Sequence, residues 1–139
     1  IKGIVLFNRF FMPEIDIDKI KLKEAVVYSS PAEFNQVLRW IGILSGKVNC
    51  NLAASTGIHD GSTIIKQLLA GADAVQVVSA IYIHGPQYIN TLIMDLEKWM
   101  DKKGFHYIDQ FKGKLSMEQK NNPASYERMQ FMKYFGGIQ

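Results

Sequence analysis

Hydrophobic residues along this chain alternate between short continuous runs and helical spacing. Residues 4–7 form a continuous apolar run with β-branched members, which is typical of a strand buried on both faces. A long connection at 10–23 follows, and the alternation of apolar and acidic residues at 15–18 indicates an extended edge piece within it. A second short extended piece is predicted at 25–28.

The next element is a helix with a clear start. Ser30 is the predicted N-cap, Pro31 occupies the first helical position, and Glu33 completes a capping box. Gly46 is the predicted stop. The apolar residues that repeat with helical spacing after the cap are Phe34, Val37, Leu38, Ile41 and Leu44.

Two more strand–helix pairs follow. A strand is predicted at 48–54, then a helix that Asp60 caps and Gly71 ends. A third strand is predicted at 74–78, and a long helix at 86–104. The apolar face of that last helix is predicted to point inward through Ile89, Leu92, Ile93, Leu96 and Met100.

The order of these elements predicts the fold class. Strands that alternate with helices are typical of an α/β fold, with parallel strands joined by right-handed crossovers. The tail is less regular: residues 105–115 are predicted to be an ordered loop, and residues 123–135 a terminal helix rich in Tyr, Met and Phe.

Composition limits the class of protein. A chain of 139 residues with 47% hydrophobic and 21% charged residues can bury one core, so we expect one soluble domain or part of one. The basic cluster at 19–23 is short and alternating, which favours a solvated face over a nucleic-acid site. No apolar run is long enough for a membrane span.

A single cysteine, Cys50, excludes an internal disulfide and favours a reducing, cytoplasmic compartment. It falls in a predicted strand and is interpreted as core filler. The chain begins at Ile1 rather than Met, almost directly in a strand, so we expect a fragment of a longer protein.

Two predicted strands end in small residues. Ser55, Thr56 and Gly57 follow the second strand, and Val78 and Ser79 end the third. Small side chains let a phosphate approach backbone N–H groups, and neighbouring βα loops of parallel barrels commonly form phosphate sites. The alternative for Gly57 is a plain strand-to-helix turn. Together the two strand ends favour a phosphate-bearing ligand.

The first strand ends in Asn8 and Arg9, which could bind a polar heterocycle and an anion respectively, or could simply cap the strand at the surface. The histidines His59, His84 and His106 show no metal-ligand spacing, and histidines in loops are most often solvated. Neither a metal nor a catalytic role is predicted for them.

Four segments resemble the dihydroorotate dehydrogenases, a family of flavin enzymes. Residues 51–85 (NLAASTGIHDGSTIIKQLLAGADAVQVVSAIYIHG) are similar to the family's strand, T-G-G-[IV] turn, L-x-x-G-A helix and V-Q-[IV]-G-T-A-L strand. Residues 7–9 resemble V-N-[ST], residues 29–32 resemble S-G-P-A, and residues 109–115 resemble D-F-x-G-K-L. The resemblance covers most of residues 3–115.

This resemblance implies the C-terminal portion of an FMN-binding (β/α)8 TIM barrel, about three βα units corresponding to strands six to eight. Residues 1–115 would be the partial barrel and residues 116–139 a C-terminal helical extension. The full protein would oxidise dihydroorotate or a related dihydropyrimidine in pyrimidine metabolism. By resemblance Asn8 would bind the substrate. The cofactor-binding residues would be Ser30, Ser55, Thr56, Gly57, Val78 and Ser79.

The sequence departs from the family pattern at three positions. Thr56 and Val78 stand where the family has glycines, and Arg9 stands where it has a hydroxyl residue. The family's catalytic Cys or Ser base and its flavin-stabilising lysine belong to strands upstream of Ile1. We therefore expect this piece to be inactive by itself, to bind FMN weakly or not at all, and to self-associate through exposed strand edges. The alternatives are another phosphate-binding TIM-barrel enzyme, or a non-catalytic barrel relative that acts as a binding or regulatory subunit.

Overall fold

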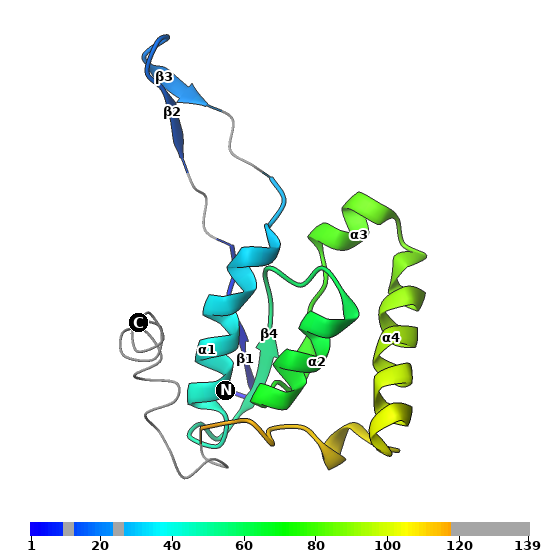
Figure 1. Cartoon of the computed structure of the whole chain (residues 1–139). Helices are drawn as coiled ribbons and strands as arrows, with labels where there is room; N and C mark the ends of the chain where they lie inside the picture. The colour runs from blue at the N-terminus through cyan, green and yellow to red at the C-terminus, as the bar shows by residue number, and fades with distance from the viewer. Residues whose placement is uncertain (10–12, 24–26, 118–139) are drawn as a thin grey trace, which may run out of the picture.

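Three parallel strands form the centre of the structure (Figure 1). The computed structural model describes residues 1–9, 13–23 and 27–117. The strand order is β1-β4-β5, and Ala54 pairs with Leu6 on one side and with Val75 on the other. The carboxyl ends of the strands therefore meet at one edge of the sheet, as the sequence predicts. The strands are β1 (Gly3–Leu6), β4 (Asn51–Ala54) and β5 (Ala74–Val75).

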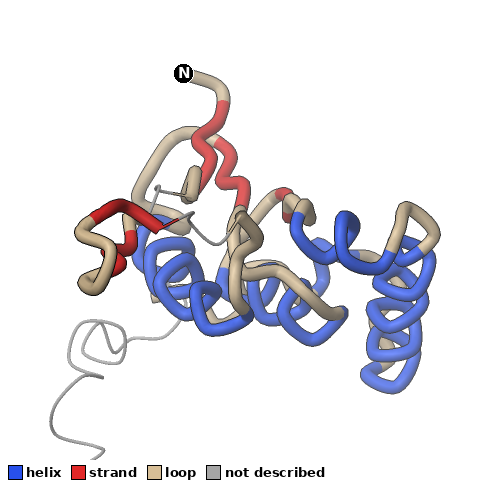
Figure 2. The backbone as a smooth tube through the Cα atoms, turned by 90° about the horizontal axis from the view of Figure 1, so that it is seen from above, coloured by secondary structure: helices blue, strands red, loops and turns tan. Residues whose placement is uncertain are grey.

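The connecting helices cover one face of this sheet (Figure 2). One helix joins β1 to β4, a second joins β4 to β5, and two more follow β5. The last of them packs against α2. The α-helices are α1 (Phe34–Leu44), α2 (Gly61–Ala70), α3 (Ser79–His84) and α4 (Tyr88–Lys103). The 3₁₀ helices are η1 (Pro31–Glu33) and η2 (Ile108–Gln110).

The core lies between the sheet and α1 and is continued by small residues at the end of α2. Its buried members are Leu6, Val37, Ile41, Leu52, Ala54, Ala70 and Ala72. A second cluster forms where the segment after α4 returns beneath the helices. There the fully buried Phe111 ring lies 5.0 Å from Trp99 and 5.3 Å from Phe105, measured between ring centroids.

A β-hairpin projects from the body between β1 and η1 (Figure 1). Its strands β2 (Glu14–Asp16) and β3 (Lys21–Lys23) pair antiparallel, with Ile15 opposite Leu22. The extended piece predicted at 15–18 is thus confirmed in part as one arm of this hairpin. Its apolar side chains are exposed, with Ile17 at 81%.

The predicted helix ends are largely confirmed. Asp60 accepts a hydrogen bond of 2.7 Å from the Thr63 N–H, and Gly71 ends α2 in the left-handed region with φ 113°. Gly104 ends α4 in the same way, with φ 72°. The Glu33 carboxylate accepts a bond of 2.7 Å from the Ser30 N–H, as a capping box requires. A 3₁₀ turn at Pro31–Glu33 precedes α1.

Two burial predictions are wrong in whole or in part. The first strand is not buried on both faces, because it lies at one edge of the described sheet and leaves Ile4 and Val5 exposed. The inward face predicted for the long helix is confirmed only in part, because Leu92 is buried and Leu96 and Met100 are partly buried where α4 packs on α2. Both Ile89 and Ile93 are about half exposed.

Two predicted strands are too long. The third strand ends at Val75, and the predicted strand end at 78 instead leads directly into the short helix α3, which the periodicity does not reveal. Cys50 precedes β4 rather than lying within it, and its side chain is partly exposed. The interpretation of Cys50 as core filler in a strand is therefore wrong.

The segment after α4 folds back onto the helices as an ordered loop. The Leu115 N–H donates to the Leu69 carbonyl, and the Met117 N–H to the Gly42 carbonyl. The helix predicted at 123–135 lies outside the described residues, so the division at residue 115 stays a prediction. No helix in the described ranges has the length and apolar character that a membrane crossing requires.

Candidate functional site

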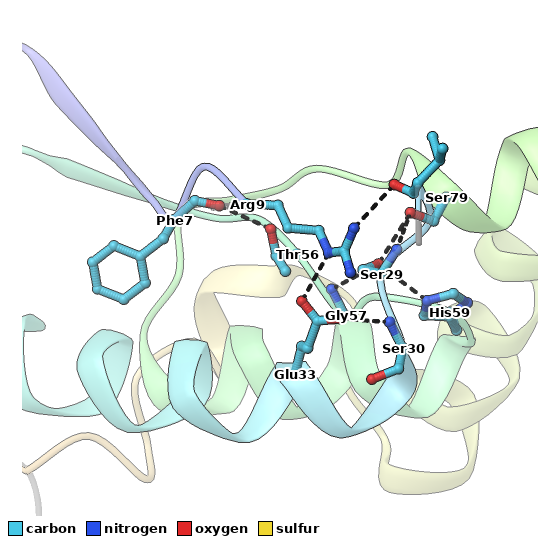
Figure 3. Close-up of polar contacts among 10 residues, drawn as sticks. Phe7, Arg9, Ser29, Ser30, Glu33, Thr56, Gly57, His59 and Ser79 are labelled. Atoms are coloured by element: carbon cyan, nitrogen blue, oxygen red, sulfur yellow. Dashed lines mark hydrogen bonds and ion pairs between the residues drawn. The ribbon is translucent and has the colours of Figure 1, made fainter. Parts of the chain in front are cut away.

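Polar groups from five chain segments meet at the carboxyl ends of β1, β4 and β5 (Figure 3). The segments are the end of β1, the connection before η1, the start of η1, the turn from β4 to α2, and the start of α3. The parallel register brings these strand ends together, because each strand runs toward the same edge of the sheet.

The turn after β4 continues the strand ladder before it bends. The Ser55 N–H donates to the Leu6 carbonyl at 2.7 Å, and the Phe7 N–H donates to the Ser55 carbonyl at 3.2 Å. Thr56 then adopts a left-handed conformation with φ 82°, which is unfavourable for a β-branched residue. Its hydroxyl donates to the Phe7 carbonyl at 2.9 Å, and this bond holds the two strand ends together.

Gly57 fills a position that no other residue fits. Its φ is 77°, and a β-carbon there would collide with the backbone of Glu33 and Phe34, where α1 begins. The missing side chain therefore allows the turn to pack against the start of α1. This packing agrees with the alternative given above for Gly57, a plain strand-to-helix turn. It accounts for the glycine without any ligand.

The Ser29 hydroxyl is the centre of the polar network. It lies 3.0 Å from the Ser79 hydroxyl and 3.2 Å from Nε2 of His59, and the Gly57 N–H donates to it at 3.3 Å. The Ser29 N–H donates to the Ser79 hydroxyl at 2.9 Å. With 8% of its surface exposed, Ser29 is effectively buried. The Tyr88 hydroxyl fixes the backbone of His59 by donating to its carbonyl at 3.1 Å.

Arg9 crosses the network beside these serines. Its Nε donates to Glu33 at 3.0 Å and one terminal nitrogen donates to the Val27 carbonyl at 3.1 Å. Burial raises the pKa of Glu33, but the hydrogen bond from Ser30 and the adjacent Arg9 together hold that pKa below its usual value. The carboxylate therefore stays ionised and keeps the guanidinium at the strand ends.

Two cavities open at this edge. We call the first the strand-end cavity; its volume is about 170 Å³, and six of the predicted site residues line it: Asn8, Ser55, Thr56, Gly57, Val78 and Ser79. Arg9, Ser29 and Gln76 add further polar groups. The second cavity, of about 300 Å³, lies between the end of β1 and α1, with Phe7 and Trp40 in its wall. Asn8, Arg9 and Thr56 line both.

The seventh predicted residue does not join the other six. Ser30 is exposed, and its N–H is used in the cap of the following helix. Its neighbour Ser29 lines the cavity instead. The backbone at Ser30 is extended, so adjacent side chains point to opposite sides. The two serines before Pro31 were the signal in the sequence for a site residue here. The sequence alone did not tell which of the two lines the cavity.

His59 also differs from its sequence interpretation. It was expected to be a solvated loop histidine, but it is half-buried and contacts Ser29. His84 is exposed and stacks on Tyr88 at 4.5 Å, and His106 is exposed. Within the described ranges, no group of three His, Cys, Asp or Glu residues is arranged to hold a metal ion.

Comparison with known proteins relates the sequence to one family, although no protein-family model matches it. Residues of this chain are 36% identical over 69 positions to dihydroorotate dehydrogenase A (fumarate) of Lactococcus lactis subsp. lactis, covering 50% of this chain and 22% of that protein. They are 40% identical over 60 positions to dihydroorotate dehydrogenase (fumarate) of Lachancea kluyveri, covering 43% and 19%. Over these segments the chain is similar to the dihydroorotate dehydrogenases.

The fold agrees with this relationship. The crystal structure of a ligand-free dihydroorotate dehydrogenase from Eimeria tenella matches 81% of this chain with a TM-score of 0.64 and 19% identity, and the match covers 32% of that chain. The fold is thus that of a portion of a (β/α)8 barrel. The chain spans between about a fifth and a third of the length of the curated relatives that it matches.

The strand-end cavity has a lining that fits a phosphate group. Its described lining contains hydroxyls and a guanidinium but no carboxylate, so donors predominate. Within the described residues, the backbone N–H groups of Val78 and Ser79 enter no hydrogen bond. The side chains of Thr56 and Val78, which replace family glycines, do not close the cavity. This donor set suits the phosphate of a flavin mononucleotide.

Proposed function

We propose that this chain is part of a flavin-dependent oxidoreductase that oxidises dihydroorotate or a related dihydropyrimidine. The observation that carries the proposal is the strand-end cavity, where the segments that resemble the family converge and present donors to an anion. The dihydroorotate dehydrogenases that the sequence matches support the reaction class. FMN is the cofactor we propose, and when bound it would supply hydride acceptance.

The residues of this chain would bind and orient. The Ser79 hydroxyl and the N–H groups of Val78 and Ser79 would hold the phosphate, and the Ser29 hydroxyl would orient Ser79 by donating to it. Thr56 and Gly57 would keep the β4 turn in place, through the Phe7 carbonyl and the close approach to α1. We propose no catalytic residue in this chain.

The substrate would lie where Asn8 and Arg9 line both cavities. Asn8 is exposed and can both donate to and accept from a pyrimidine-like ring. Arg9 replaces the hydroxyl residue of the family pattern, and its guanidinium favours a substrate that carries a carboxylate or another anion. Dihydroorotate itself carries a carboxylate, so Arg9 is compatible with dihydroorotate as well as with a related anionic dihydropyrimidine.

The decisive experiment is a flavin spectrum of the complete protein, followed by dihydroorotate-dependent dye reduction. We expect a bound flavin that Ser79→Ala weakens, whereas Thr91→Ala, which removes an exposed hydroxyl on α4, leaves it unchanged. A complete protein that binds sugar or nucleotide phosphates but no flavin would identify another phosphate-binding barrel enzyme. A complete protein that binds neither would identify a non-catalytic relative.

We also propose that the 139-residue chain alone does not oxidise dihydroorotate, binds FMN weakly or not at all, and forms homo-oligomers in the cytoplasm. The exposed edge of β1 and the exposed hairpin residues support self-association. Light scattering tests the oligomer, and a strictly monomeric chain would contradict it. Dye reduction by the purified chain would contradict its inactivity.

A further inference from the structure

The two serine hydroxyls of the strand-end cavity form a directed hydrogen-bond chain with His59 (Figure 3). A hydroxyl has one proton to donate and two acceptor positions. The Ser79 oxygen lies 2.9 Å from the Ser29 N–H and 3.0 Å from the Ser29 hydroxyl. If Ser29 donates to it, both acceptor positions of Ser79 are filled. The Ser79 proton then points away from Ser29, and Ser79 lines the cavity.

The direction of the Ser29 proton depends on His59. The Ser29 oxygen already accepts from the Gly57 N–H at 3.3 Å and lies 3.2 Å from His59 Nε2. When Nε2 carries a proton, it donates to Ser29, so Ser29 donates to Ser79. When Nε2 carries no proton, it can accept a hydrogen bond from the Ser29 hydroxyl instead. The Ser79 hydroxyl then donates to the Ser29 oxygen and not to a ligand in the cavity. The chain therefore has two directions.

We propose that His59 is a positioning residue for anion binding: a proton on its Nε2 turns the Ser29–Ser79 chain outward, so that Ser79 donates to a phosphate group in the strand-end cavity. This proposal rests on the proposed function, because it assumes the phosphate site. An anion accepts hydrogen bonds but donates none, so it gains the bond from the Ser79 hydroxyl only in the outward direction. Anion binding and the Nε2 proton must then favour each other, since coupling between two sites is reciprocal.

Arg9 lines the strand-end cavity and attracts an anion whatever the state of His59, and the remaining charged groups nearby do not account for a response of His59. Glu33 pairs with Arg9 and lines the second cavity only. Asp60 uses its carboxylate to cap α2. The ring of His84 stacks on Tyr88, whose hydroxyl bonds the His59 carbonyl rather than its ring. The hydrogen bond between the His59 ring and Ser29 is thus the contact through which a proton on Nε2 affects the cavity.

The direct test is NMR of the imidazole nitrogens of the complete protein during a titration with sulfate, which binds as an anion without a proton to donate. We expect the Nε2-protonated form of His59 to become dominant as sulfate binds, while His84 and His106 serve as internal controls and do not respond. Sulfate binding without a change at His59 would overturn this inference and leave the proposed function intact. Absence of anion binding would overturn both.

Variants provide a second test through affinity. Ser79→Ala and His59→Leu should each weaken sulfate binding about tenfold, the loss expected for a hydrogen bond to a charged group. His59→Gln, whose amide can donate from the place of Nε2, should restore most of the affinity. In the Ser79→Ala background, His59→Leu should cause no further loss, because His59 acts through Ser79. Additive losses would overturn the proposal. Thr91→Ala is the matched control.

The source of the anion is tested by replacing sulfate with FMN, riboflavin and a sugar phosphate. The His59 response should follow the phosphate and be absent with riboflavin. Tighter binding of FMN than of the sugar phosphate would assign the flavin as the natural source, and equal binding would assign phosphate compounds in general. A response to riboflavin would contradict the role of the anion.

Discussion

Gly57 is the residue at which a single added carbon should be most damaging to the site. Gly57→Ala would place a β-carbon 2.7 Å from the Phe34 Cα and 2.9 Å from the Glu33 carbonyl carbon, and closer still to the Phe34 nitrogen. These are backbone atoms at the start of α1, so no side-chain rotation can relieve the collision. Either α1 or the β4 turn must move.

Gly104→Ala is a matched control, because it separates the collision from the backbone conformation. Gly104 has φ 72°, close to the 77° of Gly57, but nothing lies within 4 Å of its added β-carbon. Both substitutions force alanine into the left-handed region at about 1–2 kcal/mol, partly offset by about 0.4–1 kcal/mol from the stiffer unfolded chain. We expect Gly104→Ala to lose about 1 kcal/mol.

The collision adds an overpacking cost of about 1–3 kcal/mol at Gly57. Gly57→Ala should therefore lose about 2–4 kcal/mol of unfolding free energy, measured by urea denaturation with the dependence on denaturant compared between variants. It should also weaken sulfate binding, because the displaced turn moves the Gly57 N–H away from Ser29. Equal losses for the two variants would refute the close approach that the structure shows.

Three further perturbations test the rest of the molecule. Phe111→Ala removes a fully buried ring and should lose about 3–5 kcal/mol in urea denaturation, whereas a loss below about 1 kcal/mol would contradict its burial. Asp73→Ala should lose about 1–3 kcal/mol because the Leu52 N–H, which donates to Asp73 at 2.8 Å, is left without its acceptor; Asp73→Asn keeps an acceptor and should lose less. Because the pKa of Glu33 is lowered in the folded chain, its carboxylate contributes to the free energy of unfolding above about pH 4.3. This contribution is lost as the pH falls through the folded-state pKa. The stability difference between the native chain and Glu33→Gln should therefore shrink in acid, and a difference that grows would reverse the assigned sign.

Local signals in the sequence were sufficient to place α1, α2 and α4, although not the short helix α3. A capping carboxylate such as Asp60 bonds the backbone three residues later, and a glycine such as Gly71 or Gly104 adopts a conformation that stops a helix. These interactions depend on neighbours in sequence, so residue identity predicts them. The parallel order of the strands follows from the same alternation of elements.

Burial and side-chain direction were harder, because they depend on distant partners. Periodicity alone gives Ile93 the same inward assignment as Leu92, but only the contact with α2 buries one and leaves the other exposed. The choice between Ser29 and Ser30 is of the same kind. Both precede Pro31, and only the packed turn at Gly57 shows which hydroxyl reaches the cavity. His59 was missed because its partner is 30 residues away.

The wide separation of the cavity residues along the chain links ligand binding to folding. The Ser29 and Ser79 hydroxyls are 50 residues apart in sequence, and β1 pairs with β4 across a similar distance. Such non-local contacts form slowly, since long segments must close before any contact is made. The cavity exists only once the sheet is complete, so an anion that binds it stabilises the folded chain by mass action. Phosphate or sulfate should therefore raise the midpoint of thermal unfolding and act as a folding ligand for the parallel sheet.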